Sequence, residues 1–271
     1  MNQTTSIDPV LWRVDERGVA YLTLNRPEVY NAYNGELIAA LHAALDSTGR
    51  EAVRVAVISG KGRNFQAGAD VKWLDAIRRM SPQDNLHASR MTAEAIERLN
   101  MLPIPTVALV QGACFGGGTG IIAACDIVIA ADDAFFSIAE IRIGVVGTII
   151  IPQLNDAISV RQVRRYALTG ERFDVTEAHR IGLVHEIVPL AELQAAGERM
   201  VGHLLAGGPE AIAVTKTCAL RYAWSNLEEG AVTGLIETHA AKRQSEEAAE
   251  GIASFLEKRS ARWNLHQRPK V

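Results

Sequence analysis

The chain has 271 residues, of which 48% are hydrophobic and 22% are charged. This composition is typical of a globular protein and excludes a disordered, collagen-like or low-complexity chain. With 28 basic and 31 acidic residues the formal net charge is −3, which does not favour nucleic acid or an anionic membrane as the main ligand.

The cysteines and the N-terminal residues show no pattern typical of a secreted or membrane protein. Cys114, Cys125 and Cys218 form no CxxC pair, so we expect no disulfide framework and no metal site, and interpret them as reduced, mostly buried thiols. The first residues lack the basic and apolar segments of a signal peptide. No run of 18 apolar residues occurs, so we expect no membrane span and a cytoplasmic protein.

The first part of the chain alternates between strand and helix patterns. In chain order we predict a strand at 19–24, a helix at 35–47, a strand at 53–58, a helix at about 83–102, a strand at 106–110, a helix near 117–124, and strands at about 126–130 and 134–137. From about residue 190 the pattern is helix after helix, including 210–222, which carries Ala211, Val214, Cys218 and Tyr222 on one apolar stripe. This order favours an α/β core over residues 1–195 and a helical C-terminal region over 196–271.

Motifs for nucleotide and zinc chemistry are incomplete. A GxGxxG beginning at Gly116 would need glycine where Ile121 stands, and no P-loop ending is present. His185 and Glu186 begin an HExxH motif, but Pro189 occupies the place of the second histidine.

Two glycine-containing turns indicate a different chemistry. Gly116 to Gly118 and the turn Gly68-Ala69-Asp70 each follow a strand and precede a helix. Backbone N–H groups at the start of a helix have no acceptor within it, so two such turns can bind one developing oxyanion.

A series of short motifs occurs in order along nearly the whole chain. They are Asn25-Arg26-Pro27-Glu28…Asn31-Ala32, Phe65-Gln66-Ala67-Gly68-Ala69-Asp70-Val71-Lys72, Pro105-Thr106-Val107, Gly112…Gly116-Gly117-Gly118, Cys125-Asp126-Ile127, Phe136-Ser137-Ile138-Ala139-Glu140, Leu168-Thr169-Gly170, Ile181-Gly182-Leu183-Val184 and Phe255-Leu256-Glu257-Lys258-Arg259. With these motifs the chain resembles the crotonase (enoyl-CoA hydratase/isomerase) superfamily, and most of all bacterial hydratases of the methylglutaconyl-CoA kind.

The resemblance implies an α/β fold, a crotonase-like spiral of ββα units with a helical C-terminal trimerisation region, and assembly into a homotrimer or a dimer of trimers. It implies an acyl-CoA substrate with no cofactor beyond that coenzyme A. The backbone N–H groups of Ala69 and Gly117 would hold the thioester oxygen. Contacts to coenzyme A would come from Ala67, Asp70, Val71, Lys72, Phe255 and Lys258.

The chain departs from the family in its carboxylates. Family hydratases often carry two glutamates; the first falls where this chain has Gly120, and the second matches Glu140. We therefore predict an enoyl-CoA hydratase with one glutamate as both acid and base, or alternatively an enoyl-CoA isomerase or a hydratase-lyase. Apolar neighbours of Glu140 predict burial and a raised pKa, which suits a group that both takes and gives a proton.

Side chains around Glu140 leave several hypotheses open. Thr119, or a residue of the 75–95 segment such as Asn85 or His87, would hold a water molecule for hydration. In an extended segment Arg142 would share a face with Glu140 and bind the carboxylate of a glutaconyl-type substrate, unless it forms a surface or interface salt bridge. Gly120 would leave space for a bulky or branched acyl chain.

Two non-enzymatic functions remain as alternatives. The basic tail Lys258, Arg259, Arg262, Arg268 and Lys270 would suit RNA, but residues 35–49 contain neither lysine nor arginine, so we expect no nucleic-acid partner. A catalytically inactive relative is disfavoured by the complete set Ala69, Gly117 and Glu140.

Overall fold

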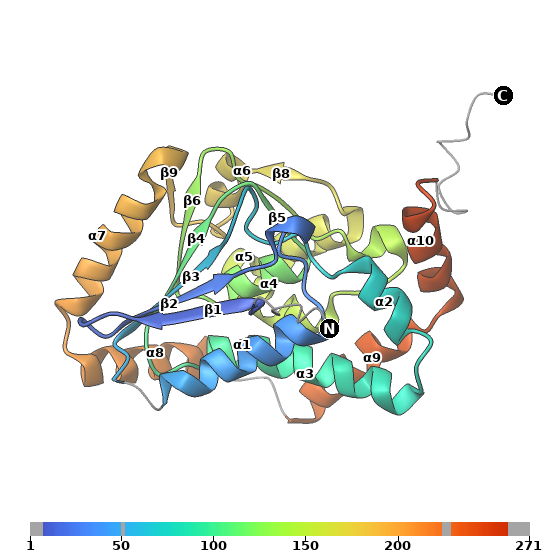
Figure 1. Cartoon of the computed structure of the whole chain (residues 1–271), viewed down its shortest axis with the longest axis horizontal. Helices are drawn as coiled ribbons and strands as arrows, with labels where there is room; N and C mark the ends of the chain where they lie inside the picture. The colour runs from blue at the N-terminus through green and yellow to red at the C-terminus, as the bar shows by residue number, and fades with distance from the viewer. Residues whose placement is uncertain (1–7, 50–51, 224–228, 260–271) are drawn as a thin grey trace, which may run out of the picture.

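The structure, a computed structural model, describes residues 8–49, 52–223 and 229–259, and its strands form two sheets (Figure 1). The larger sheet has the order β1-β2-β3-β4-β6-β9, and the smaller has the order β5-β7-β8. The bounds are β1 (Val10–Val14), β2 (Val19–Leu24), β3 (Val55–Gly60), β4 (Thr106–Val110), β5 (Ala113–Phe115), β6 (Ile127–Ala131), β7 (Phe135–Ser137), β8 (Phe173–Asp174) and β9 (Glu186–Val188). Strands β1 and β2 are antiparallel, and the other neighbours in the larger sheet are parallel.

Helices surround the sheets and continue to the end of the described chain. They are α1 (Gly35–Thr48), α2 (Val71–Ile77), α3 (Pro82–Asn100), α4 (Gly117–Ala123), α5 (Ile151–Thr169), α6 (Val175–Arg180), α7 (Leu193–Leu205), α8 (Pro209–Ala223), α9 (Glu229–Arg243) and α10 (Glu246–Leu256). Short 3₁₀ turns are η1 (Pro27–Val29), η2 (Glu140–Ile143), η3 (Thr148–Ile150) and η4 (Leu190–Glu192). Across the described residues, no helix combines the length and apolar composition that a membrane crossing needs.

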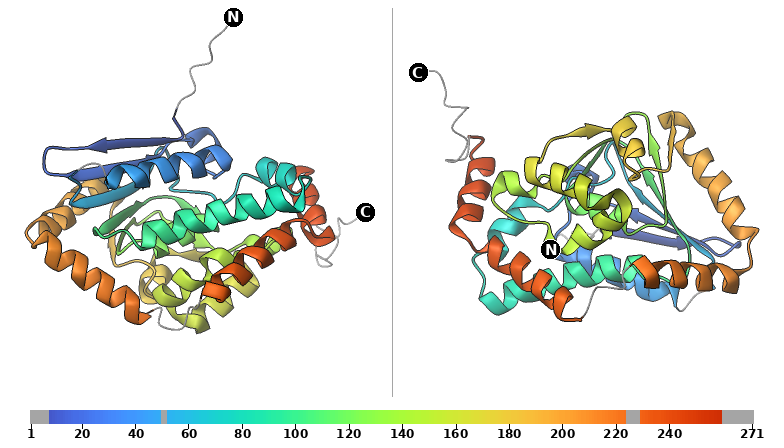
Figure 2. Two further views of the ribbon diagram at one scale, coloured as in Figure 1. Left: turned by 90° about the horizontal axis from the view of Figure 1, so that it is seen from below. Right: turned by 180° about the vertical axis from the view of Figure 1, so that it is seen from behind.

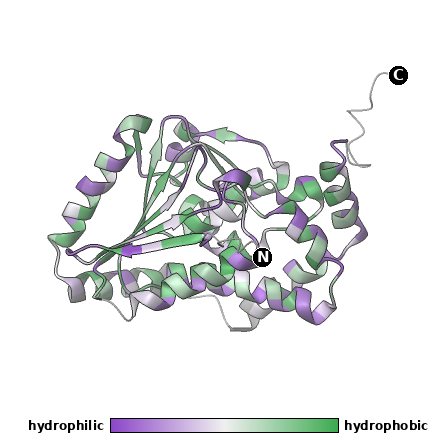
Figure 3. Cartoon of the chain, viewed as in Figure 1, coloured by the Kyte–Doolittle hydropathy of each residue, from purple (hydrophilic) through white to green (hydrophobic). Residues whose placement is uncertain are grey.

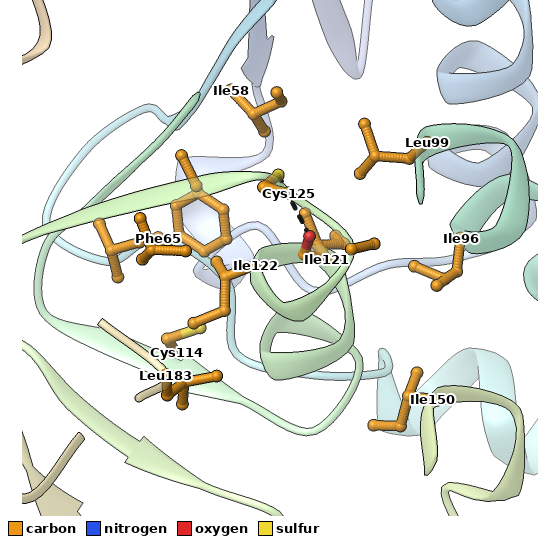
Figure 4. Close-up of a cluster of buried hydrophobic side chains, with 14 of the residues drawn as sticks. Ile58, Phe65, Ile96, Leu99, Cys114, Ile121, Ile122, Cys125, Ile150 and Leu183 are labelled. Atoms are coloured by element: carbon orange, nitrogen blue, oxygen red, sulfur yellow. Dashed lines mark hydrogen bonds between the residues drawn. The ribbon is translucent and has the colours of Figure 1, made fainter. Parts of the chain in front are cut away.

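Both faces of the larger sheet are covered. All residues of β4 are buried, as expected for a central parallel strand. One face packs against α7 through Leu109, Ile129 and Val201, and the other contributes to the main core with α1, α3 and α4. Apolar residues accordingly concentrate on the central strands and inner helices (Figure 3). Figure 4 shows Phe65, Cys114 and Ile122 among the buried side chains around α4.

Most predicted elements are present, with small shifts in their bounds. Strands 19–24 and 106–110 match β2 and β4, whereas β3 runs Val55–Gly60, two residues later than predicted. The predicted boundary between residues 195 and 196 falls within α7, and the division into core and oligomerisation region stays a prediction.

Part of the stripe predicted for helix 210–222 does not face the core, and the side chains of its other members, Ala211 and Tyr222, lie outside the described residues. Val214 and Cys218 are exposed, whereas Cys114 and Cys125 are buried. Helix α8 instead turns Lys216 inward, where its Nζ donates to Asp126 at 2.8 Å. The inward side of this helix therefore carries a partly buried ion pair, which the apolar pattern alone did not reveal.

The turn at η1 is fastened to the segment that follows β3. Asn31 is fully buried, and its amide Nδ2 lies 3.0, 3.0 and 3.1 Å from the carbonyl oxygens of Lys61, Asn64 and Phe65. Its Oδ1 accepts from the backbone N–H of Arg26 at 2.9 Å. Asn31 has φ 58°, a left-handed conformation that asparagine tolerates better than most residues.

We predict that Asn31→Ala lowers the free energy of unfolding by about 2–4 kcal/mol, because buried carbonyls lose their donor and alanine is strained at this φ. Asn31→Gly avoids the strain at this φ but does not restore the side-chain hydrogen bonds, so it should recover only part of the lost free energy of unfolding. Urea unfolding of the three proteins measures both effects. A loss below about 0.5 kcal/mol in the alanine variant, within the range of an ordinary surface change, would contradict this role.

Candidate active site

Three parallel segments bring the predicted catalytic positions to one edge. Gln66 pairs with Cys114 of β5, and Cys114 pairs with Phe136 of β7, both in parallel register. Ala69 and Gly117 each lie three residues beyond their paired position, and Glu140 lies four beyond Phe136. Since parallel segments run in one direction, the residues that follow them emerge at the same edge of this small sheet.

This edge opens into a cavity of about 1190 Å³. Ala69, Gly117 and Glu140 all line it. Much of the remaining wall is apolar, with Leu37 and Leu41 from α1, Ile96 from α3, and Ile149 and Ile150 from η3. A cavity with an apolar wall and a few convergent polar groups is typical of a site for an acyl chain.

Two backbone N–H groups are available at the cavity. The N–H of Tyr33 donates to Gly68 O at 2.9 Å, and the N–H of Asp70 donates to Tyr33 O at 2.9 Å. This parallel bridge uses the residues on either side of Ala69, so the N–H of Ala69 points away from Tyr33. Gly117 is the first residue of α4, so its N–H has no acceptor within the helix. Among the described residues, neither N–H has a hydrogen-bond acceptor.

The turn at Gly68 is held by a side chain that the sequence analysis missed. The amide of Gln66 accepts from Gly68 N at 2.8 Å and donates from Nε2 to Gly68 O at 3.0 Å. Gly68 has φ +88°, which favours glycine, and a Cβ added at Gly118 would lie 2.7 Å from Gln66 Oε1. Gln66 therefore positions the Ala69 donor and requires glycine at position 118.

Glu140 lies between two glycines at the end of β7. A Cβ at Gly116 or Gly147 would lie 2.8 or 3.0 Å from its Oε1, so a side chain at either position would displace the carboxyl. Its Oε2 is buried and has no hydrogen-bond partner in the described part of the chain. Burial raises the pKa of Glu140 from 4.5 to about 7, as the apolar neighbours predicted. The group can therefore both accept and donate a proton near neutral pH.

Position 120 does not provide the space that the sequence suggested. A Cβ at Gly120 would lie 2.2 Å from Cγ2 of Ile150, and Ile150 itself lines the cavity. The volume freed by glycine is thus occupied by the isoleucine of η3. Our expectation that Gly120 widens the site for a bulky acyl chain is wrong for this reason.

The three candidates for holding water are also wrong. The hydroxyl of Thr119 donates to Gly116 O at 2.6 Å, within its own helix turn. The amide of Asn85 donates to Ala240 O, and His87 is exposed. None of the three lines the cavity.

The extended conformation expected around Arg142 is not found. Residues Glu140–Ile143 form the 3₁₀ turn η2, and Arg142 donates to Gly170 O at 2.9 Å and to Thr169 O at 3.2 Å. Arg142 thus binds the carbonyl groups at the end of α5.

The residues predicted to contact coenzyme A divide into two groups. Ala67, Val71, Phe255 and Lys258 line the cavity. Asp70 does not line it; its carboxylate caps α2 and lies 3.2 Å from Arg26 Nη2. Lys72 is exposed and does not line the cavity. Contact of these six residues with coenzyme A stays a prediction. In the described residues, no cluster of three or more His, Cys, Asp or Glu gathers to hold a metal ion.

Comparison with known proteins decides the family. Residues 15–266 match the model of the Enoyl-CoA hydratase/isomerase family. The chain belongs to this family. It is an enzyme of the crotonase superfamily with the crotonase-like fold.

Individual relatives cover nearly the whole chain. It is 30% identical to the hydroxycinnamoyl-CoA hydratase-lyase of Pseudomonas fluorescens, over 92% of this chain and 93% of that protein. It is 31% identical to the mevalonyl-coenzyme A hydratase sidH of Aspergillus fumigatus, over 90% of this chain and 91% of that protein. The crystal structure of an enoyl-CoA hydratase from Mycobacterium avium superposes with a TM-score of 0.83 at 32% identity, covering 95% and 99% of the two chains.

The packing of Gly120 on Ile150 predicts coupled effects on stability. Gly120→Ala should lower the free energy of unfolding by about 1–3 kcal/mol, because overpacking outweighs the better helix propensity of alanine. Ile150→Ala should cost about 2–5 kcal/mol alone. The double variant should be at least about 1 kcal/mol more stable than the sum predicts, as measured by urea unfolding. Additive costs would show that the two side chains do not compete for one space.

Proposed function

We propose that this enzyme is an enoyl-CoA hydratase in which Glu140 is the single acid and base. The observation that carries the proposal is the Glu140 carboxyl, which has a pKa of about 7 and an Oε2 without a hydrogen-bond partner among the described residues, in the same cavity as the N–H groups of Ala69 and Gly117. The coenzyme A of the substrate is the only cofactor that the proposal requires. Assembly into a homotrimer or a dimer of trimers is part of it, carried over from the resemblance.

In this mechanism the two N–H groups donate to the thioester oxygen of the bound enoyl-CoA. The Glu140 carboxylate takes a proton from water while the water oxygen bonds to Cβ of the acyl group. The double-bond electrons move toward the thioester and form an enolate, whose negative oxygen the N–H groups stabilise. Protonated Glu140 then gives its proton to Cα, which completes the hydroxyacyl product and restores the carboxylate.

The oxyanion donors and Glu140 are each expected to contribute substantially to the reaction rate. Removing one oxyanion donor typically costs about 2.7–4 kcal/mol in the transition state. A positioned general acid or base contributes roughly 10²–10⁴-fold in rate. A pKa near neutral pH serves both proton transfers, because neither protonation state of Glu140 is then scarce.

The same groups support two alternative reactions. An isomerase would use Glu140 to move a proton between two carbons of the acyl chain, with the same enolate and no added water. A hydratase-lyase would go on to cleave the hydroxyacyl product, and one relative carries that name. Binding of RNA has less support, since Arg259 of the basic tail pairs with Glu250 and Glu257.

Product analysis in deuterated water tests the proposal. We expect crotonyl-CoA, a branched enoyl-CoA or glutaconyl-CoA to gain a hydroxyl at Cβ and one deuterium at Cα, seen by mass spectrometry and NMR. Glu140→Gln should lower kcat by roughly 10²–10⁴-fold and change the Kd for a saturated acyl-CoA only slightly, because the amide keeps the shape but carries no proton. Migration of the double bond without a hydroxyl would identify an isomerase instead. Activity of the variant within tenfold of wild type would remove Glu140 from the mechanism.

A further inference from the structure

The water molecule in the reaction proposed above has two hydrogens, and Glu140 accepts only one of them. The hydrogen that stays on the water oxygen needs an acceptor of its own, because an unpaired polar group inside a cavity is costly. The three candidates that the sequence suggested do not line the cavity, and Gly120 has no side chain. Another side chain of the wall is therefore needed to orient the water toward Cβ of the acyl group.

Tyr33, which lies just before α1, is fixed against both oxyanion turns. Its backbone pairs with Ala69 in a parallel bridge. Its ring meets Trp73 of α2 edge-on, with the two ring centroids 5.7 Å apart. A Cβ at Gly117 would lie 2.5 Å from Tyr33 Cε1, so the ring also packs directly on the first residue of α4. The position of the phenol is therefore set by the same turns that carry the two N–H donors.

The phenol ring and the Glu140 carboxyl pack against consecutive residues. A Cβ at Gly116 would lie 2.8 Å from Glu140 Oε1, and the next residue, Gly117, faces Tyr33. Consecutive Cα atoms are about 3.8 Å apart, and all four of these residues line the cavity. The acid/base group and the phenol thus flank the turn at which the thioester oxygen would bind.

The Tyr33 hydroxyl is available to bind water. Among the residues that the structure describes, it has no hydrogen-bond partner. A hydroxyl that already donates to a carbonyl is held in one direction, whereas the phenol of Tyr33 can turn its hydrogen and its lone pairs toward a water molecule. The other hydroxyl groups that line the cavity all donate to backbone oxygens: Thr92 to Ala88 O at 2.8 Å, Ser137 to Gly170 O at 3.1 Å, Thr169 to Arg165 O at 2.9 Å and Ser254 to Gly251 O at 2.8 Å.

The phenol is neutral at pH 7 and lies in the field of both Glu140 and Arg243. Burial raises the pKa of Tyr33 to about 12, the charge of Arg243 lowers it, and the charge of Glu140 raises it. Arg243 is the last residue of α9, which packs beside α3 (Figure 2), and it lines the same cavity. A guanidinium has only donors, so Arg243 cannot accept a hydrogen from the water, whereas a neutral phenol oxygen can.

Building on the hydration proposed above, we propose that Tyr33 is a second catalytic residue, which holds the attacking water. The phenol oxygen accepts the hydrogen that the water keeps, while the Glu140 carboxylate takes the other hydrogen as a proton and the water oxygen bonds to Cβ. Tyr33 keeps its own proton throughout, so it orients the water and leaves the proton balance of the reaction unchanged. It thereby supplies the second polar group that is missing at Gly120.

Tyr33→Phe tests this role, because phenylalanine keeps the ring packing on Gly117 and Trp73 and removes only the hydroxyl. Two reactions are compared in deuterated water. The first is hydration of the enoyl-CoA that the wild type hydrates fastest among crotonyl-CoA, a branched enoyl-CoA and glutaconyl-CoA. The second is exchange of the Cα hydrogens of the matching saturated acyl-CoA for deuterium, which uses Glu140 and the two N–H donors but adds no water. We expect the variant to lose roughly 10- to 100-fold in kcat for hydration and to stay within about threefold of the wild type in exchange.

Tyr30→Phe is the matched control, because Tyr30 is 58% exposed and does not line the cavity. It should leave both rates as in the wild type. Hydration by Tyr33→Phe within about threefold of the wild type would show that the hydroxyl does not hold the water, and equal losses in both reactions would show that it acts on the enolate or on the fold instead. Either result overturns the role of Tyr33 and leaves the proposed function in place. A wild type that exchanges Cα hydrogens but hydrates no enoyl-CoA would refute the proposed function itself, and the water-holding role with it.

Discussion

The parallel alignment of the Gln66 segment, β5 and β7 is the constraint on which the site depends. Backbone pairing at Gln66, Cys114 and Phe136 fixes where each segment ends, and the next few residues hold Ala69, Gly117 and Glu140. The donors are backbone groups, so their directions follow from the pairing and from the first turn of α4. Asn31 and Gln66 reinforce this arrangement through buried amide hydrogen bonds to the same stretch of chain.

Two ionisable side chains in the cavity wall have buried polar atoms that lack a hydrogen-bond partner among the described residues. Glu140 retains an unpaired Oε2, and Arg243 retains unpaired Nε and Nη1. Because the pKa of Glu140 is raised from 4.5 to about 7 on folding, its proton-linked contribution to stability is present below pH 4.5 and is lost as the pH rises through 7. Such costs are typical of sites where binding and catalysis, rather than stability, determine the environment of a group.

The sequence predicted the features that depend on local pattern. The strand at 106–110, the two glycine turns and the apolar surroundings of Glu140 all follow from short-range residue order, and the structure has each of them. It could not predict side-chain partners that come from distant elements. Ile150 of η3 occupies the space beside Gly120, and Gly170 at the end of α5 takes the guanidinium of Arg142. Arg243 carried no motif, and only the packing of α9 on α3 places it at the cavity.

Glu140 titrates near neutral pH because burial disfavours its charged form, and its Oε2 has no hydrogen-bond partner among the described residues to offset this. Infrared difference spectra between the wild type and Glu140→Gln, recorded across pH 4 to 9 in the free enzyme, isolate the carbonyl band of the protonated Glu140 carboxyl. We predict that this band is present at low pH and disappears with a midpoint near pH 7. A midpoint near 4.5, the ordinary value for glutamate, would show that the carboxyl is solvated and would contradict the account.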